Sequence, residues 1–442
     1  MRRIILLLIA FTILFITLKL PALDTPIAKG LGILAFIGFL WITETFEIYT
    51  TALVVPILAV IFGIFDVKTA FSAFSHPIIF LFLAGFVFAG AMSKYHIDRY
   101  IAYRIVAISR GNLFLSAILI MIITAFLSMW MSNTSTTALM LPIVMGITRH
   151  LEHKERVFFL LLTAYSASLG GLGTPVGSPP NALAAAITGI TFQQWFFKSI
   201  PFLVVGLAVL ITVLMLVIKP DLSVQGIRMD ERIRFSPGRK GTVLIILFIM
   251  TAIGWIFSDY FSSLMGIEKG FDTFVAIFFV VLLLAGDIIN WSDVQKYVNW
   301  GILLLFGGGL TLSAIMKETG TAHFISSWLL EVLKGFPSWA ILLVIILMAI
   351  FLTELMSNTA LSAILIPIII PLADSLGFYQ QMIAMVIAYA ASCAFMLPVA
   401  TPPNALVFGT GDIRQQEMMR VGFVLNIVFA LLILTYFLIF RI

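Results

Sequence analysis

The sequence Met131-Ser132-Asn133-Thr134-Ser135-Thr136-Thr137 lies inside a long apolar stretch, and a second copy follows as Met356-Ser357-Asn358-Thr359-Ala360-Leu361-Ser362. Polar groups that meet no water in hydrocarbon cost several kcal/mol, so they must bond to one another, to backbone or to a ligand. A single Ser-Asn-Thr triplet is explained by a helix kink or by one hydrogen bond between helices. Two triplets in corresponding places indicate the two halves of one site.

The composition around these triplets is that of a polytopic membrane protein. The 442 residues are 61% hydrophobic and 11% charged, with a mean hydropathy of +1.13, whereas soluble domains are about 25% charged. The single cysteine, Cys393, excludes an intrachain disulfide framework and metal sites built on several thiolates. The net charge of +5 fits basic cytoplasmic loops and gives no indication of nucleic-acid binding.

The pattern of apolar spans predicts an all-α membrane protein with eleven transmembrane helices and two re-entrant helical hairpins. The hairpins are expected at about 112–148 and 338–371, each with a triplet in its middle. The crossings are expected near residues 4–20, 27–43, 51–65, 77–93, 157–187, 199–218, 241–258, 271–289, 300–316, 378–408 and 420–440.

The distribution of basic residues predicts the orientation. With a cytoplasmic N-terminus, eighteen Lys and Arg residues fall on the inner side and eight on the outer side, as the positive-inside rule requires. We therefore expect an integral protein of the plasma (inner) membrane whose C-terminus is outside. The first hairpin should open to the cytoplasm and the second to the exterior.

The chain after its first helix has the organisation of an inverted repeat. Asn358 follows Asn133 by 225 residues, and Lys317 follows Lys94 by 223. Each half contains five crossings, an odd number, so the second copy is inserted upside down, as in many secondary transporters. The expected parts are a scaffold of four helices and an interfacial arm at 1–110, a first transport part at 111–218, a cytoplasmic linker at 219–240, a second scaffold part at 241–337 and a second transport part at 338–442.

A second pair of motifs interrupts the spans 157–187 and 378–408. The first contains Gly170-Gly171-Leu172-Gly173-Thr174-Pro175-Val176-Gly177-Ser178-Pro179-Pro180-Asn181, and the second Leu397-Pro398-Val399-Ala400-Thr401-Pro402-Pro403-Asn404. Because Gly and Pro do not continue a helix, both spans should break near the middle of the bilayer. At such breaks, free carbonyl groups attract a cation and free amide groups attract an anion.

These motifs resemble the divalent-anion/sodium symporter family, which carries di- and tricarboxylates and, in some members, sulfate. The resemblance extends over nearly the whole chain and includes Trp41-Ile42-Thr43-Glu44 and Trp300-Gly301-Ile302-Leu303-Leu304-Leu305-Phe306-Gly307-Gly308-Gly309. It implies a homodimer in which a transport domain of hairpins and broken helices slides against a fixed scaffold. It also implies sodium ions bound at the hairpin tips by Ser128, Ser132, Asn133, Gly177, Thr353, Asn358 and Ala400. The implied substrate-binding residues are Asn133, Thr134, Ser178, Asn358, Thr359, Thr401 and Pro402.

The expected function is secondary active import of succinate-like di- or tricarboxylates, coupled to sodium by an elevator movement. A sodium-independent dicarboxylate exchanger and a carrier of another divalent oxyanion such as sulfate are alternatives, and an ion channel is the alternative from another class. An intramembrane enzyme would need a nucleophile–base pair or a metal set, and the motifs contain neither. Glu354, three residues before Ser357, is interpreted as a brace of the second hairpin, with proton coupling as the alternative.

Overall fold

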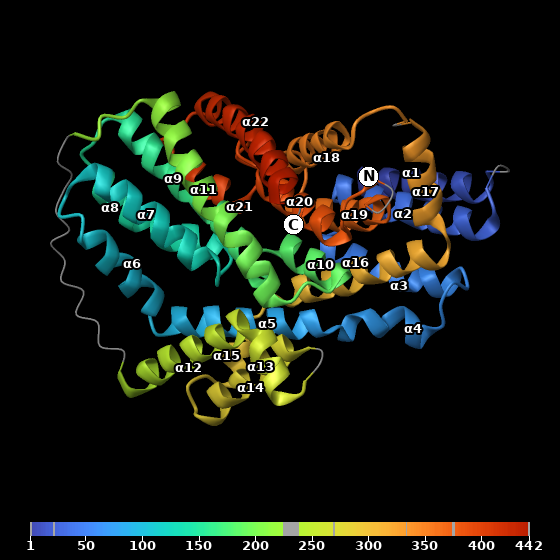
Figure 1. Cartoon of the computed structure of the whole chain (residues 1–442), viewed down its shortest axis with the longest axis horizontal. Helices are drawn as coiled ribbons and strands as arrows, with labels where there is room; N and C mark the ends of the chain where they lie inside the picture. Colours follow the sequence, from blue (N-terminus) through green and yellow to red (C-terminus); the bar gives the residue numbers. More distant parts are fainter. Residues whose placement is uncertain are drawn as a thin grey trace.

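The structure, a computed structural model, describes residues 2–20, 23–223, 238–267, 270–332, 334–373 and 376–440. Every regular element in these residues is a helix, which confirms the predicted all-α class (Figure 1). Most of the expected linker, residues 224–237, lies outside the described residues.

The first half contains the elements that the apolar spans predict. They are α1 (Arg2–Leu18), α2 (Thr25–Thr43), α3 (Ile48–Ile61), α5 (Pro77–Lys94), α7 (Leu113–Ser128), α8 (Asn133–Thr148), α9 (His153–Gly170), α10 (Pro179–Thr188) and α11 (Phe192–Ile218). The second half repeats this order. It consists of α12 (Gly238–Ile256), α14 (Phe271–Ala285), α16 (Trp300–Glu318), α18 (Ser338–Thr353), α19 (Asn358–Ile369), α20 (Gln380–Ser392), α21 (Pro402–Phe408) and α22 (Gln415–Phe440).

The length and apolar composition of these helices decide how many can each span a bilayer as one continuous helix. In the described part of the chain, seven helices are long and apolar enough to cross a membrane, and all seven coincide with predicted crossings. The other four predicted crossings fall on α1, α3, α14 and the α20–α21 pair, which are shorter helices. The total of eleven crossings therefore stays a prediction.

Two features of the helices differ from the sequence prediction. α11 begins at Phe192 and not near residue 199, because Thr191 and Gln194 form a capping box that starts the helix about two turns earlier. Five short helices also lie outside the predicted spans, since they are too short or too polar to register as apolar segments. They are α4 (Val67–Ser72), α6 (Ile97–Ala107), α13 (Ser258–Met265), α15 (Trp291–Tyr297) and α17 (Thr321–Val332).

Both long broken spans are interrupted where their Gly and Pro residues predict. After α9, the chain forms two single 3₁₀ turns, η2 (Gly171–Gly173) and η3 (Pro175–Gly177), before α10 begins at Pro179. In the second half, α20 ends at Ser392 and α21 begins at Pro402. A proline suits the first helical turn because the N–H it lacks would have no partner there.

The interruptions gather in the middle of the molecule. In Figure 1, α7, α8 and α9 lie toward one end of the long axis and α1, α2 and α17 toward the other, with α10, α20 and α21 between them. The second helix of each hairpin packs on the post-break helix of the other half, α8 on α21 and α19 on α10. The fold thus brings the two hairpin tips and the two helix breaks together from four separate stretches of sequence.

The helix α16 supports this centre from the side of α3 and α5. Its glycines allow unusually close packing: a Cβ atom at Gly308 would lie 2.5 Å from the carbonyl oxygen of Ala52 in α3. On its other side, α16 contacts α10 and α19. α16 therefore lies between the N-terminal helices and the interrupted elements.

Candidate functional site: two hairpin tips and two helix breaks

The tip between α7 and α8, called the inner tip after its predicted orientation as the tip between α18 and α19 is called the outer, brings three oxygen atoms together. The Oγ of Ser128 lies 2.7 Å from Oδ1 of Asn133 and also 2.7 Å from the carbonyl oxygen of Ala167 in α9. A hydroxyl group has one hydrogen and donates it fully to only one of these acceptors. The arrangement therefore has more acceptors than donors, which is the chemistry that a small cation satisfies.

The outer tip, between α18 and α19, repeats the same arrangement. The Oγ1 of Thr353 lies 2.7 Å from Oδ1 of Asn358 and 3.0 Å from the carbonyl oxygen of Ala391 in α20. Ala391 follows Ala167 by 224 residues, in register with the repeat. The internal symmetry of the sequence is thus reproduced in the contacts of individual atoms.

The residues predicted to hold sodium are brought together more completely at the inner tip. A Cβ atom built on Gly171 would lie 2.5 Å from Oδ1 of Asn133 and 3.1 Å from the carbonyl oxygen of Gly177, so both oxygens face the same small space. These oxygens and Ser128 Oγ form a neutral set of the kind that binds Na⁺ at broken helices.

The four other predicted sodium ligands are placed differently. Thr353 and Asn358 meet at the outer tip, whereas the described contacts do not join Ala400 to either of them. The Oγ of Ser132 accepts the N–H of Ser135 at 3.2 Å and caps α8. The side chain of Ser132 is therefore already engaged in ending the turn.

The predicted substrate residues lie at four helix N-termini. Ser178 and Thr401 are the residues before α10 and α21, while Thr134, Thr359 and Pro402 belong to the first turns of α8, α19 and α21. Helix N-termini carry free amide groups and a partial positive charge, so they suit an anion.

The two hydroxyls at the breaks are not equivalent. Thr401 Oγ1 accepts the N–H of Asn404 at 3.3 Å. Ser178 Oγ is buried and has no hydrogen-bond partner among the described residues. A buried hydroxyl without a partner costs free energy, so Ser178 is the hydroxyl of this group that a bound anion would satisfy.

The two asparagines that end the second pair of motifs have a structural role at the breaks. Asn181 Nδ2 donates to the carbonyl oxygens of Gly171 and Thr174, both at 2.8 Å. Asn404 Nδ2 donates to the corresponding oxygens of Ala394 and Leu397, at 2.9 and 3.0 Å. Each asparagine fixes the shape of its interrupted segment. The signal was present in the sequence, since Pro-Pro-Asn occurs twice in register.

Glu354 joins the outer tip to the second break. Its Oε1 accepts the N–H of Met396 at 2.9 Å and the Nδ2–H of Asn426, in α22, at 2.8 Å. Its Oε2 accepts the N–H of Leu397 at 3.0 Å. These bonds agree with a brace, the interpretation that the sequence favoured, and proton coupling stays the alternative.

A contact from the first half also reaches the second break. The Tyr165 hydroxyl, on α9, donates to the carbonyl oxygen of Phe395 at 2.7 Å, and both residues are fully buried. Together with the packing of α8 on α21 and α19 on α10, this bond makes one connected unit of the tips and breaks.

Comparison with known proteins gives consistent matches. The model of the citrate transporter family (CitMHS) matches residues 39–382. An uncharacterized transporter of Haemophilus influenzae is 43% identical over 95% of this chain and 93% of its own length. The sodium-dependent dicarboxylate transporter SdcS of Staphylococcus saprophyticus is 32% identical over 96% of this chain and 89% of its own. Among solved structures, the Neisseria gonorrhoeae MtrF transporter shares the fold, with a TM-score of 0.56 and 14% identity over 84% of this chain and 82% of MtrF.

Proposed function

The chain belongs to the citrate transporter family, and we propose that it imports a succinate-like di- or tricarboxylate together with sodium ions. The family and the named relatives are transporters, which excludes the enzyme class. The relative SdcS is named as a sodium-dependent dicarboxylate transporter, in agreement with the resemblance to the divalent-anion/sodium symporters.

The observation that carries the proposal is the paired oxygen cluster at the two tips. Ser128 with Asn133, and Thr353 with Asn358, offer neutral oxygens to cations in both halves of the repeat. The adjoining helix N-termini and the Ser178 hydroxyl offer donors to the carboxylates of the substrate. Because the site has no fixed charge of its own at these positions, bound sodium offsets the charge of the dianion, and moving the loaded site through hydrocarbon becomes less costly.

We assign residues to each ligand as the resemblance to the divalent-anion/sodium symporters implies. Sodium ions would be held at the inner tip by Ser128, Asn133 and Gly177, with Ser132 contributing backbone, and at the outer tip by Thr353, Asn358 and Ala400. The substrate would lie between the tips, against Asn133, Thr134, Ser178, Asn358, Thr359, Thr401 and Pro402.

An elevator movement would carry this site across the membrane. We assign residues 111–218 and 338–442 to the moving part, with the hairpins re-entrant, and residues 1–110 and 241–337 to the scaffold, which would form the homodimer. The boundary between the two parts passes between α16 and α19, where a Cβ atom at Gly309 would lie 3.8 Å from the Cβ of Ala363. The protein would lie in the inner membrane with its N-terminus cytoplasmic and its C-terminus outside.

The test of the proposed function is uptake of radiolabelled succinate into proteoliposomes with and without a sodium gradient. Uptake driven by the gradient is expected. Uptake that needs internal dicarboxylate but no sodium would assign the chain as an exchanger, and uptake of sulfate alone would assign another oxyanion. Counterflow of labelled against unlabelled succinate separates a carrier from a channel, because a channel shows none.

The boundary between α16 and α19 offers a separate test of the movement. A distance of 3.8 Å between Cβ atoms is about the mean for disulfides, so the double variant Gly309→Cys, Ala363→Cys should cross-link on oxidation. The native Cys393 is buried and should not compete. Oxidation is expected to stop uptake and reduction to restore it, while either single variant stays active. Full uptake by protein shown to be cross-linked would contradict an elevator at this boundary.

A further inference from the structure

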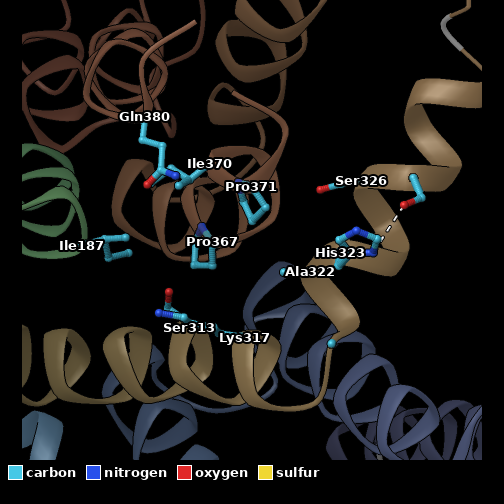
Figure 2. Close-up of a pocket in the computed structure, with 12 residues that line it drawn as sticks. Ile187, Ser313, Lys317, Ala322, His323, Ser326, Pro367, Ile370, Pro371 and Gln380 are labelled. Carbon is cyan, nitrogen blue, oxygen red and sulfur yellow. Dashed lines mark hydrogen bonds between the residues drawn. The ribbon is translucent and has the colours of Figure 1, made fainter. Parts of the chain in front are cut away.

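A cavity of about 420 Å³ lies away from the tips, at the far end of the outer hairpin. It is bounded by the C-terminal end of α16, the first turns of α17, the residues around Pro367 and Pro371, and the first residue of α20 (Figure 2). Its volume is within the range of small-molecule sites. It contains none of the residues assigned above to the substrate or to sodium.

Polar groups from two helices, α16 and α17, meet in this cavity. Lys317 and Ser313, on α16, form one side of it, and His323 and Ser326, on α17, form another (Figure 2). Ser326 is only 5% exposed, and its Oγ has no hydrogen-bond partner among the described residues. Such a buried hydroxyl is costly unless something in the cavity bonds to it.

The position of α17 adds further donors. Gly320 and Ala322, which precede and begin this twelve-residue helix, both line the cavity. The first N–H groups of a helix have no partner within the helix, and they attract negative charge. A lysine, an unpartnered hydroxyl and a helix N-terminus thus face one space.

The corresponding positions in the first half of the repeat have different partners. Lys94, which corresponds to Lys317, pairs with Asp293 at 2.6 Å between Nζ and Oδ2, and this ammonium group lowers the pKa of the Asp293 carboxyl. Asp98, which corresponds to Thr321, accepts the N–H of Arg99 at 2.7 Å in the first turn of α6. Carboxylates of the protein itself, one of them from α15 in the second half, therefore meet both Lys94 and the start of α6.

Around Lys317 and the start of α17, no described residue supplies such a carboxylate. Thr321 has no charge, and its hydroxyl is engaged with Thr319 and with the carbonyl oxygen of Ile27. No described Asp or Glu lies within ion-pair distance of Lys317. The lysine and the helix N-terminus occur in both halves, whereas the described acidic partners meet only those of the first half.

We propose that this cavity is a second anion site, which binds a carboxylate-bearing anion of the class proposed above for transport. The choice of a carboxylate rests on the proposed function, whereas the site itself rests on Lys317, Ser326 and the start of α17. An anion held here contacts α16 and α17 on one side and the outer hairpin on the other. It would therefore favour the arrangement of scaffold and hairpin seen in this structure, since a ligand stabilises the conformation that it binds best.

The test uses a cysteine reporter in the purified full-length protein. Ser327 lines the cavity and is exposed, so Ser327→Cys should react with the uncharged reagent N-ethylmaleimide. The matched control is Arg104→Cys, at the corresponding exposed position of α6. Alkylation rates are measured with succinate, citrate or sulfate at constant ionic strength, with chloride as the reference anion.

Succinate or citrate is expected to slow alkylation at position 327 several-fold and to leave position 104 unchanged. Adding Lys317→Gln should abolish this protection, while adding Asn358→Asp, at the outer tip, should preserve it. Absence of protection by every anion, protection that survives Lys317→Gln, or protection lost in Asn358→Asp would each overturn the site. Protection by sulfate alone would overturn its assignment to carboxylates.

The reporter assay also separates this proposal from the proposed function. Protection is read on solubilised protein and requires no transport, and succinate uptake is measured in parallel on the Ser327→Cys protein. Protection without uptake supports the cavity and contradicts the proposed function. Uptake without protection supports the proposed function and overturns the cavity.

Discussion

At the inner tip the residue after Ser128 is Met129, and its side chain packs against Gly173 in the first break, where a Cβ atom would lie 2.9 Å from Met129 Cγ and Cε. At the outer tip the residue after Thr353 is Glu354, and its carboxylate accepts the N–H groups of Met396 and Leu397 in the second break. A thioether and a carboxylate thus join tip to break in the two halves. The oxygen clusters that they support are alike.

The two helix breaks also differ, in how closely their backbones pack. A Cβ atom at Gly177 would overlap the carbonyl oxygen of Gly171, so the first break is folded tightly on its own backbone. The corresponding residue of the second break is Ala400, which has a Cβ atom and excludes such packing. The second break keeps the turn closed by the N–H of Ala400 and the carbonyl oxygen of Leu397 at 3.2 Å, but it has no counterpart of η2. The comparison indicates that one half is shaped by close packing of glycine and the other by the hydrogen bonds of a buried acid.

The largest effect is expected from substitutions at the two tips. They test whether both tips are needed for transport in spite of this difference. Asn133→Asp or Asn358→Asp keeps the size of the side chain, adds a negative charge beside the anion and removes the amide donor. Either change is expected to abolish succinate uptake in proteoliposomes while the protein keeps its elution volume and melting temperature.

A matched Asn→Asp control is available in α7. Asn112 accepts the N–H of Leu115 at 2.8 Å and caps that helix, a role that aspartate fills equally well. Asn112→Asp should therefore transport normally. Normal uptake with unchanged sodium dependence in both tip variants would place the binding site elsewhere, and loss in only one of them would make the tips unequal.

The second prediction concerns the brace at the outer tip. Glu354→Gln replaces one accepting oxygen by an NH₂ group that faces backbone N–H donors, so it should cost about 3–4 kcal/mol of stability. We expect a lower melting temperature and weaker sodium dependence of uptake. Met129→Leu, at the corresponding position, conserves volume and should cost less than about 1.5 kcal/mol.

The Glu354→Gln variant also separates the two interpretations of Glu354. A proton-coupling carboxylate would make uptake depend on pH in the native protein, and Glu354→Gln would remove that dependence. A brace changes stability and sodium affinity and leaves the shape of the pH profile as it was. A flattened profile in a variant of native melting temperature would contradict the brace.

The third prediction addresses the packing at the inner break. Gly177→Ala places a Cβ atom where the carbonyl oxygen of Gly171 lies, and backbone has to move, at a cost of about 2–3 kcal/mol. Apparent sodium affinity should fall by more than about tenfold, since 1.4 kcal/mol is a factor of ten. The reverse change, Ala400→Gly, should be tolerated to within about 1 kcal/mol. Equal tolerance of both changes would remove the distinction between the halves.

The sequence was enough to place the two hairpins and both helix breaks, because Gly and Pro act locally and the triplets occur twice. It was also enough to interpret Glu354 as a brace, since a buried acid needs partners. It could not identify those partners. The amides of Met396 and Leu397 lie 42 and 43 residues away from Glu354. A sequence does not show which backbone N–H groups a side chain meets.

The short helices were difficult to predict from the sequence for a different reason. α15 and α17 are too short to give a hydropathy signal. Which residues they contact depends on where the chain turns after α14 and α16. The pairing of Lys94 with Asp293 spans 199 residues, so only the structure shows that Lys317 is without such a partner among the described residues. Repeats show which positions correspond, and their separate environments appear only when the chain is folded.

The smallest expected effect concerns the threonines that follow the two asparagines. Thr134 is exposed in the first turn of α8 and Thr359 is partly exposed in the first turn of α19, so each hydroxyl is available to a carboxylate of the substrate. Thr134→Ala and Thr359→Ala should each weaken the apparent affinity for succinate by about 1–2 kcal/mol and leave the maximal rate nearly unchanged. Concentration dependence of uptake measures this, with Ser135→Ala as a control for the capping hydroxyls of the inner tip. If the substrate lies evenly between the halves, the two threonine variants should lose similar affinity, and a much larger loss at one tip would show that the anion is bound mainly by that half.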